Sequence, residues 1–355
     1  MNRHPLPPPA VDPRPTPLVS VVIVNYNAWP DVAALVGSLS ASPEVSGGVC
    51  EVVVVDNASD GPVPPTLRSP APGVRLIVRG DNGGFAVGVN AGWRAARGRW
   101  LLLLNPDVVA EAGLLARVVE RVRRYEADRR GAPGVVGFGL RNPDGTRQPS
   151  VGTFPNLGRT VWEQLIPRSR RKYQAVWRTR PGPVAWVTGA CVVVNGAMLE
   201  ELGGLDEEFF LYYEEVALCR SARRRGWRVE YDPSIEVVHL RPLQNRPVTP
   251  MMRVITRHSK LLYFRKHLPR WQFLGLCAVV AAEARLLGVL AGARRRAEEA
   301  RAWRTVATVE RALRGGSELV GRDVLTLAAA VARVDPPKAP KGPTGRRRRP
   351  LRQKH

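Results

Sequence analysis

The sequence predicts an α/β protein in which a mostly parallel, mixed sheet is flanked by helices in a Rossmann-like arrangement. Two observations indicate this class. Short runs of β-branched residues and leucine alternate with segments of helical spacing along the first 125 residues. The runs are apolar throughout, which is typical of strands buried on both faces of a parallel sheet. In sheets of this kind, ligands bind beyond the carboxyl ends of the strands.

The expected elements follow one another along the chain. Strands are expected at Leu18–Tyr26, Glu51–Asp56, Val74–Val78, Trp100–Leu104 and Val135–Leu140. Helices are expected at Pro30–Leu39, Phe85–Ala96, Glu111–Tyr125 and Leu211–Gly226. Proline suits the first turn of the first helix, and glycine ends the last of them.

Composition narrows the class of partner. The chain has 355 residues, with 54 Lys and Arg against 31 Asp and Glu, so its net charge of +23 predicts attraction to polyanions. The four cysteines include no CxxC pair, which fits reduced thiols in a cytoplasmic protein and argues against a zinc site. Residues 1–17 are Pro-rich without the apolar core of a signal peptide, and we expect them to be disordered.

Polar side chains follow three of the expected strands. The first strand ends in Asn25-Tyr26-Asn27, the second in Asp56-Asn57-Ala58-Ser59-Asp60, and the fourth in Asn105-Pro106-Asp107. Because parallel strands end at one edge of a sheet, these carboxylates and amides are expected to share a rim. The sequence therefore predicts a ligand site there.

The tripeptide Asn-Pro-Asp occurs twice, and its two contexts differ. Asn142-Pro143-Asp144 precedes Gly145, a pattern that suits a type I turn and predicts a hairpin tip. Asp107 instead follows a buried strand, where one carboxylate and diphosphate oxygens would suit Mg²⁺. The alternative for Asp107 is a cap on the helix expected near Glu111.

Nine blocks of sequence resemble the inverting family 2 glycosyltransferases of the GT-A fold, in particular the rhamnosyltransferase-like branch that builds bacterial polysaccharides. The resemblance covers roughly residues 18 to 240. The blocks are SVVIVNYN (20–27), VVVDNAS (53–59), NGGFAVGVN (82–90), LLNPD (103–107), WVTGA (186–190), GLDEEFF (204–210), YEEVALCR (213–220), GWR (226–228) and VVH (237–239).

The resemblance implies roles for the rim residues. Asn25, Asn27 and Asp56 would hold the nucleotide of a sugar donor, with Asp56 at the base or ribose. Asp107 would be the metal-binding residue of the motif usually written Asp-x-Asp, for Mg²⁺ or Mn²⁺. Asn105 replaces the first Asp of that motif, which leaves one carboxylate for the cation.

Three further residues have two interpretations each. His239 lies where related enzymes can place another metal or diphosphate ligand, and the alternative is a structural histidine with satisfied nitrogens. Asn82 and Asn90 flank a Gly-rich segment that predicts a loop and a helix start beside the donor. They would either hold the sugar or diphosphate, or only cap and pack.

Two acids begin the helix expected after Leu211. Glu214 and Glu215 suit the first turn electrostatically, which is a sufficient structural reason for them. The resemblance implies more, since family members usually have Glu-Asp here and the second acid is the general base. Glu215 takes that place with one additional methylene, and Ala217 replaces a following acidic position.

Residues 246–335 are expected to form a helical, membrane-associated extension, and residues 336–355 a disordered basic tail. The apolar stretch Trp271–Gly292 is long enough to cross a membrane. Glu283 and Arg285 near its middle argue against a simple span, so a helix lying in the interface or packed on a partner fits better. Codon bias toward Arg is an additional explanation for part of the charge.

The sequence therefore predicts a metal-dependent inverting glycosyltransferase over residues 18–245. The donor would be dTDP-rhamnose or a UDP-hexose, and the acceptor a hydroxyl of a glycan or polyprenyl-linked glycan at the inner face of the plasma membrane. The rival is a sugar-nucleotide or glycan-binding module impaired at Asn105 and Ala217. No recognisable nucleic-acid module accompanies the basic tail, which argues against nucleic-acid binding.

Overall fold

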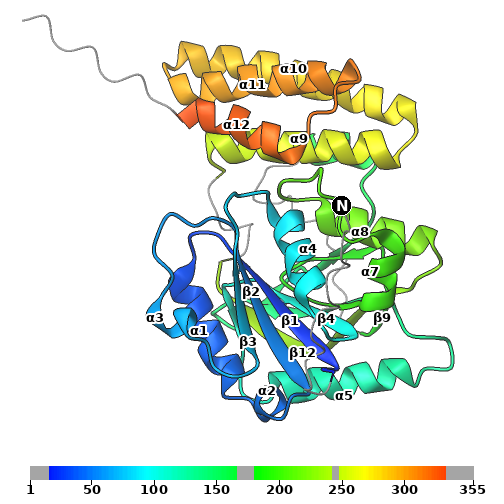
Figure 1. The fold of residues 1–355 in the computed structure, drawn as a ribbon. Coiled ribbons are helices and arrows are strands. Elements are labelled where there is room, and N and C mark those ends of the chain that lie inside the picture. The colour runs from blue at the N-terminus through cyan, green and yellow to red at the C-terminus, as the bar shows by residue number, and fades with distance from the viewer. Residues whose placement is uncertain (1–15, 166–179, 242–247, 333–355) are drawn as a thin grey trace, which may run out of the picture.

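A computed structural model of the chain describes residues 16–165, 180–241 and 248–332. The expectations for residues 1–15 and for the basic tail lie outside these ranges. The main sheet has the order β3-β2-β1-β4-β11-β6-β12-β5. Its first four strands, which are labelled in Figure 1, are parallel. The mixed character comes from β11, which runs antiparallel to both β4 and β6.

Every strand expected in the first 140 residues is present. The strands of the main sheet are β1 (Val19–Asn25), β2 (Cys50–Asp56), β3 (Val74–Val78), β4 (Trp100–Leu104), β5 (Val108–Val109), β6 (Val135–Arg141), β7 (Arg147–Gln148), β9 (Gly182–Pro183), β11 (Cys191–Asn195) and β12 (Val229–His239). A separate pair consists of β8 (Val151–Gly152) and β10 (Trp186–Val187). Residues of β1, β2 and β4 are buried throughout, as continuous apolar runs predict.

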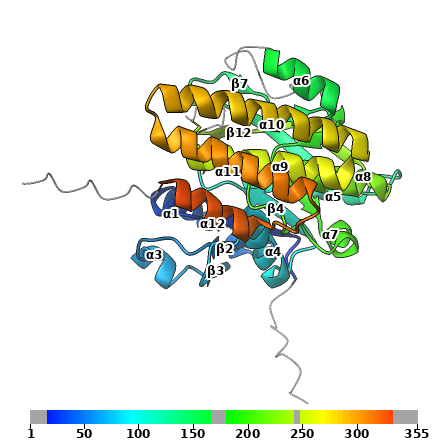
Figure 2. The same ribbon diagram turned by 90° about the horizontal axis from the view of Figure 1, so that it is seen from above.

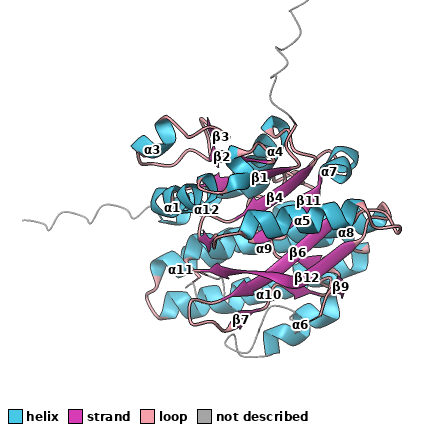
Figure 3. Cartoon of the chain, turned by 90° about the horizontal axis from the view of Figure 1, so that it is seen from below, coloured by secondary structure: helices cyan, strands magenta, loops and turns pink. Residues whose placement is uncertain are grey.

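Helices cover both faces of the sheet (Figure 3). The described helices are α1 (Trp29–Ser40), α2 (Pro43–Ser46), α3 (Pro65–Arg68), α4 (Phe85–Ala95), α5 (Leu114–Glu126), α6 (Leu157–Leu165), α7 (Gly196–Leu202), α8 (Glu214–Arg224), α9 (Pro250–His267), α10 (Arg270–Ala293), α11 (Ala297–Arg314) and α12 (Gly321–Ala332). Side chains of α1 and α5 share one core with alternate residues of the strands. Side chains of α4, α7 and α8 share the other.

The structure corrects the expected start of one helix and confirms the expected hairpin tip. The helix expected from Glu111 begins at Leu114, because Gly113 adopts a left-handed backbone with φ of 76° at its N-cap. The second Asn-Pro-Asp is confirmed as a hairpin tip between β6 and β7. There the Gly145 amide donates to the Asn142 carbonyl over 2.9 Å.

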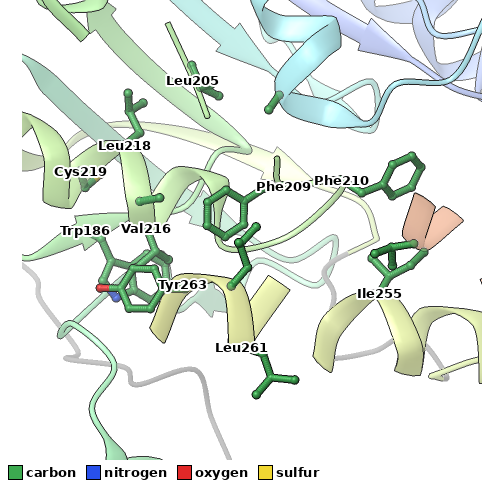
Figure 4. Close-up of a cluster of buried hydrophobic side chains, with 14 of the residues drawn as sticks. Trp186, Leu205, Phe209, Phe210, Val216, Leu218, Cys219, Ile255, Leu261 and Tyr263 are labelled. Carbon is green, nitrogen blue, oxygen red and sulfur yellow. The ribbon is translucent and has the colours of Figure 1, made fainter. Parts of the chain in front are cut away.

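The C-terminal helices α9–α12 form a layer that is set against α8 and the loop before it (Figures 1 and 2). Figure 4 shows the junction, where Phe209, Val216 and Leu218 lie in the same buried cluster as Ile255 and Tyr263 of α9. The apolar core on this face is therefore continuous between the sheet and the helical layer.

The interface between α4 and the sheet generates a stability prediction. An ideal Cβ on Gly92 would lie 2.5 Å from Cγ1 of Val22, while one on exposed Gly37 of α1 would meet nothing within 4 Å. Overpacking costs about 1–3 kcal/mol, whereas replacing an unhindered helical glycine by alanine gains about 0.4–1 kcal/mol. Gly92→Ala should therefore lower, and Gly37→Ala raise, the free energy of unfolding in urea titrations. Equal effects of the two variants would contradict this packing.

Candidate functional site

The ends of β1 and β2 are joined by buried polar side chains. Asn25 and Asp56 are adjacent partners in the parallel pair, and Nδ2 of Asn25 donates to Oδ1 of Asp56 over 2.7 Å. The hydroxyl of Ser59 donates to the same oxygen over 2.6 Å. The carboxyl of Asp56 is 3 % exposed. Burial of a carboxylate is costly unless donors surround it, and these contacts hold Asp56 at the rim of the sheet.

The outer part of this rim is exposed. Asn27 adopts a left-handed backbone with φ of 55°, and its side-chain amide donates to Asp60 over 2.8 Å. Its backbone amide donates to the hydroxyl of Ser59 over 2.8 Å. The structure therefore links the strand ends of β1 and β2 through Ser59, a residue to which the sequence analysis gave no separate role.

Asp107 and His239 lie side by side because β5 pairs antiparallel with the end of β12. In this pairing Val108 is opposite His239, and the Leu240 amide donates to the Asp107 carbonyl over 2.9 Å. Oδ1 of Asp107 is 3.4 Å from Nε2 of His239, and both residues are buried. The alternative role of Asp107 as a helix cap is wrong, since the N-cap residue of α5 is Gly113.

Gln148 of β7 fixes the ring of His239. Nε2 of Gln148 donates to the carbonyls of His239 and Arg141, over 2.7 and 3.0 Å, so its Oε1 is an acceptor. This oxygen lies 3.0 Å from Nδ1 of His239, which must carry the proton of the neutral ring. In this tautomer Nε2 carries the lone pair; it is buried, makes no hydrogen bond with any described residue and lies 3.4 Å from Oδ1 of Asp107.

A ring nitrogen with a free lone pair and a nearby carboxylate oxygen are ligand atoms that fit a divalent cation. The described residues contain no group of three or more His, Cys, Asp and Glu that could hold a metal ion. Two protein ligands nevertheless suit Mg²⁺, which keeps several waters and binds substrate phosphates. Asp107 and His239 are thus the residues that would hold such an ion, together with a ligand.

Arg241 adds a cation to this place. Its Nε lies 3.8 Å from Oδ2 of Asp107, and its guanidinium also pairs with Asp31 of α1. The side chain is half exposed, so it remains accessible from solvent. An arginine suits the recognition of phosphate oxygens because its planar group can donate two parallel hydrogen bonds.

The acids of α8 occupy apolar surroundings. Burial and the neighbouring Glu215 raise the pKa of Glu214 well above its ordinary value, and burial raises the pKa of Glu215 to about 7. One oxygen of each carboxyl is buried and has no hydrogen-bond partner among the described residues. Glu215 also lines a small cavity with Phe85 and Gly189. A carboxyl that titrates near neutral pH is suited to general base catalysis.

Glu215 lies close to the turn that contacts the first Asn-Pro-Asp. A Cβ on Gly189 would lie 4.0 Å from Cβ of Glu215, and the next residue, Ala190, accepts a hydrogen bond from the Asn105 amide over 3.0 Å. The α8 acids and the end of β4 therefore flank the same turn.

The asparagines that flank the Gly-rich segment are engaged locally. The side-chain oxygen of Asn82 accepts from the Gly84 amide over 3.1 Å. The side chain of Asn90 is buried and exchanges hydrogen bonds with the backbone of Leu205, while its Nδ2 also donates to Glu207. These contacts favour roles in the local turn and in packing over direct binding of the sugar, and Asn82 does not cap α4, whose N-cap residue is Gly84.

The sequence matches glycosyl transferase family 2 over residues 20–203, which is about half of the chain. The chain therefore belongs to this family, and its curled mixed sheet with flanking helices is a GT-A fold. The predicted family and fold class are confirmed.

Curated relatives extend the comparison beyond this domain. The chain is 29% identical over 242 residues to N-acetylglucosaminyl-diphospho-decaprenol L-rhamnosyltransferase of Mycobacterium tuberculosis, covering 63% of this chain and 76% of the relative. It is 26% identical to the low-salt glycan biosynthesis hexosyltransferase Agl10 of Haloferax volcanii, covering 63% and 68%. Among solved structures, the mannosyltransferase PcManGT of Pyrobaculum calidifontis aligns with a TM-score of 0.47 and 20% identity over 90% of this chain and 88% of that one.

Gln148 and Arg241 were not identified from the sequence. Gln148 stands 91 residues from the histidine that it contacts. Arg241 follows His239 by only two positions, so its proximity to a candidate ligand was an available signal.

The raised pKa of Glu215 generates a prediction for activity. Below about pH 7 its carboxyl is protonated and unable to accept a proton, so kcat/KM for sugar transfer should rise with pH through this range. Glu215→Gln should lower kcat about 10²–10⁴-fold and remove this limb of the profile. Glu214→Gln is the matched control, since burial and the neighbouring Glu215 raise the pKa of Glu214 well above its ordinary value, which disfavours its ionised form. A larger loss in the Glu214 variant would reverse the assignment of the base.

Gln148 is predicted to control metal affinity through the tautomer of His239. Gln148→Leu removes the acceptor for Nδ1–H, and loss of such an outer contact costs about 10–100-fold in metal affinity. Electron paramagnetic resonance of Mn²⁺, titrated into the protein with UDP or dTDP, measures this without any turnover. Gln148→Glu retains an acceptor oxygen and should bind Mn²⁺ more tightly than the Leu variant. Equal affinity in all three proteins would contradict the prediction.

Proposed function

We propose that this protein transfers a sugar from a nucleoside diphosphate donor to a hydroxyl of a lipid-linked glycan, with inversion at the anomeric carbon. The donor is dTDP-rhamnose or a UDP-hexose. The proposal is supported by the name of the Mycobacterium tuberculosis relative, which specifies L-rhamnosyl transfer to a diphospho-decaprenol-linked sugar. Synthesis of a cell-surface polysaccharide is the corresponding process.

The observation that carries the proposal is the pairing of Asp107 with His239, on the same sheet whose other strand ends hold Asn25 and Asp56. Asn25, Asn27 and Asp56 would bind the nucleoside, and Asn105, Asp107 and His239 would lie at the diphosphate. A divalent cation held there would offset the negative charge that develops on the departing diphosphate. Arg241 is placed to add a second positive charge.

Glu215 would accept the proton of the acceptor hydroxyl as the hydroxyl oxygen attacks the anomeric carbon of the donor. The bond to the diphosphate oxygen breaks in the same displacement, so the configuration inverts and no covalent enzyme intermediate forms. Burial also raises the pKa of Glu214, which disfavours a second negative charge beside the base. We place this reaction at the cytoplasmic face of the plasma membrane, where nucleotide sugars and a lipid-linked acceptor would meet.

The two copies of Asn-Pro-Asp provide a matched test. Isothermal titration of UDP and dTDP in the presence of Mn²⁺ should show binding that EDTA weakens and that Asp107→Ala abolishes. Asp144→Ala changes the same residue type in the same tripeptide, on the exposed hairpin tip, and should bind nucleotide like the wild type. The nucleotide that binds more tightly identifies the donor class.

The remaining outcomes are equally informative. Nucleotide binding that is indifferent to both EDTA and Asp107→Ala would contradict the metal site. Binding that is intact in a protein unable to release sugar from either donor, or to transfer it, would favour the rival, a binding module impaired at Asn105 and Ala217.

A further inference from the structure

The outer face of α10 is apolar and open to solvent. This face is defined here by exposed residues of α10 at helical spacing, namely Trp271, Leu274, Ala278, Ala282, Arg285, Leu286, Val289 and Ala293. Trp271, Leu286 and Val289 are 65, 63 and 72 % exposed. Monomeric proteins rarely expose a contiguous apolar patch of this kind unless it binds a partner or a membrane.

The opposite face of α10 is committed to the helical layer. Phe273, Leu276, Cys277, Val280 and Ala284 are buried there, in the core shared with α9 and α11. The only acid of α10, Glu283, forms an ion pair with Arg257 of α9 over 2.5 Å, and Arg257 lies over the ring of buried Trp303. Of the two charges that argued against a membrane-spanning helix, Glu283 is therefore paired within the helical layer, while Arg285 remains exposed on the outer face.

Among the described helices α10 alone is long and apolar enough to cross a membrane by length and composition. Spanning would remove its inner face from the core and would expose the Arg257–Glu283 pair to lipid. A helix that keeps its inner contacts and presents only its outer face is instead suited to lie in the plane of a membrane interface.

The charges around the outer face indicate which kind of partner it binds. Arg270 begins α10, Arg285 lies on the outer face, and Arg294, Arg295 and Arg296 follow its last turn, all of them exposed. A second copy packed on this face would bring arginines against arginines, because α10 has no exposed acid and the nearest one along the chain, Glu298, belongs to the first turn of α11. An anionic lipid surface meets both requirements, since it accepts apolar side chains and attracts each basic residue.

We propose that the outer face of α10 docks this protein on an anionic lipid bilayer, with the helix parallel to the membrane plane. Because α9 and the loop before α8 share one core with α10, docking would hold the Glu215 region close to the bilayer surface. The inference extends the proposed location of the enzyme. Its test uses neither donor nor acceptor, so its failure leaves the proposed transfer reaction standing.

Co-sedimentation of the full chain with vesicles tests the proposal. Vesicles of phosphatidylcholine with about 30% phosphatidylglycerol should bind the protein. Val289→Glu should weaken this binding about tenfold or more, because an acid replaces an apolar side chain that docking would bury in the bilayer. Val78→Glu is the matched control, since Val78 ends β3 and is 59 % exposed. It should change binding less than twofold, and both variants retain the basic tail.

Three results would overturn the proposal. Equal loss of binding in the two variants would assign it to net charge rather than to α10. Unchanged binding of Val289→Glu, in a protein whose circular dichroism and Tm match those of the wild type, would exclude the outer face. A wild-type dimer that Val289→Glu converts to a monomer in lipid-free light scattering would identify a second copy as the occupant.

Discussion

The antiparallel pairing of β5 with the last residues of β12 is the contact on which the candidate site depends. Only this pairing brings Asp107, at the end of the first half of the sheet, beside His239, more than 130 positions later. The second Asn-Pro-Asp shows a different use of the tripeptide, since Asp144 accepts hydrogen bonds from the amide and the hydroxyl of Thr146 within its own hairpin turn. A local motif thus acquires a candidate metal-binding role through its tertiary neighbour.

The second constraint is the position of the α8 acids in an apolar environment. Tyr212 and Tyr213 both adopt left-handed backbone conformations immediately before Glu214, which is costly for aromatic residues and requires support from the surroundings. Helix α9 supplies that support. The hydroxyl of Ser259 donates to the Leu211 carbonyl over 2.8 Å, and the rings of Tyr213 and Tyr263 have centroids 5.5 Å apart. The C-terminal layer therefore supports the backbone beside the candidate base as well as presenting a surface to solvent.

Much of the fold could be predicted from the sequence, for a physical reason. A strand buried on both faces must be apolar throughout, so β1, β2 and β4 are visible as uninterrupted runs. The strand ends then identify Asn25, Asp56 and Asp107 as rim residues. A two-residue strand such as β5 has no pattern of its own, so its pairing with β12 could not be predicted. For the same reason Gln148, on the two-residue strand β7, was not connected with His239.

Backbone conformation and contacts between helices also limited what could be predicted for the helices. The start of α5 depends on the backbone conformation of Gly113, and the inward orientation of Glu283 depends on Arg257 of a neighbouring helix. Neither feature can be read from the spacing of apolar residues along the sequence. The composition of α10 allowed a membrane-spanning helix, a helix lying in the interface or a helix packed on a partner, and the packing of its inner face argues against the first of these.

The most direct test of the account is the anomalous scattering of Mn²⁺ in crystals grown with UDP or dTDP. The account predicts one strong peak within bonding distance of both the Asp107 carboxylate and Nε2 of His239, with the diphosphate of the nucleotide on the same ion. A bound nucleotide whose diphosphate lies away from these two residues, or a Mn²⁺ peak elsewhere in the protein, would contradict it.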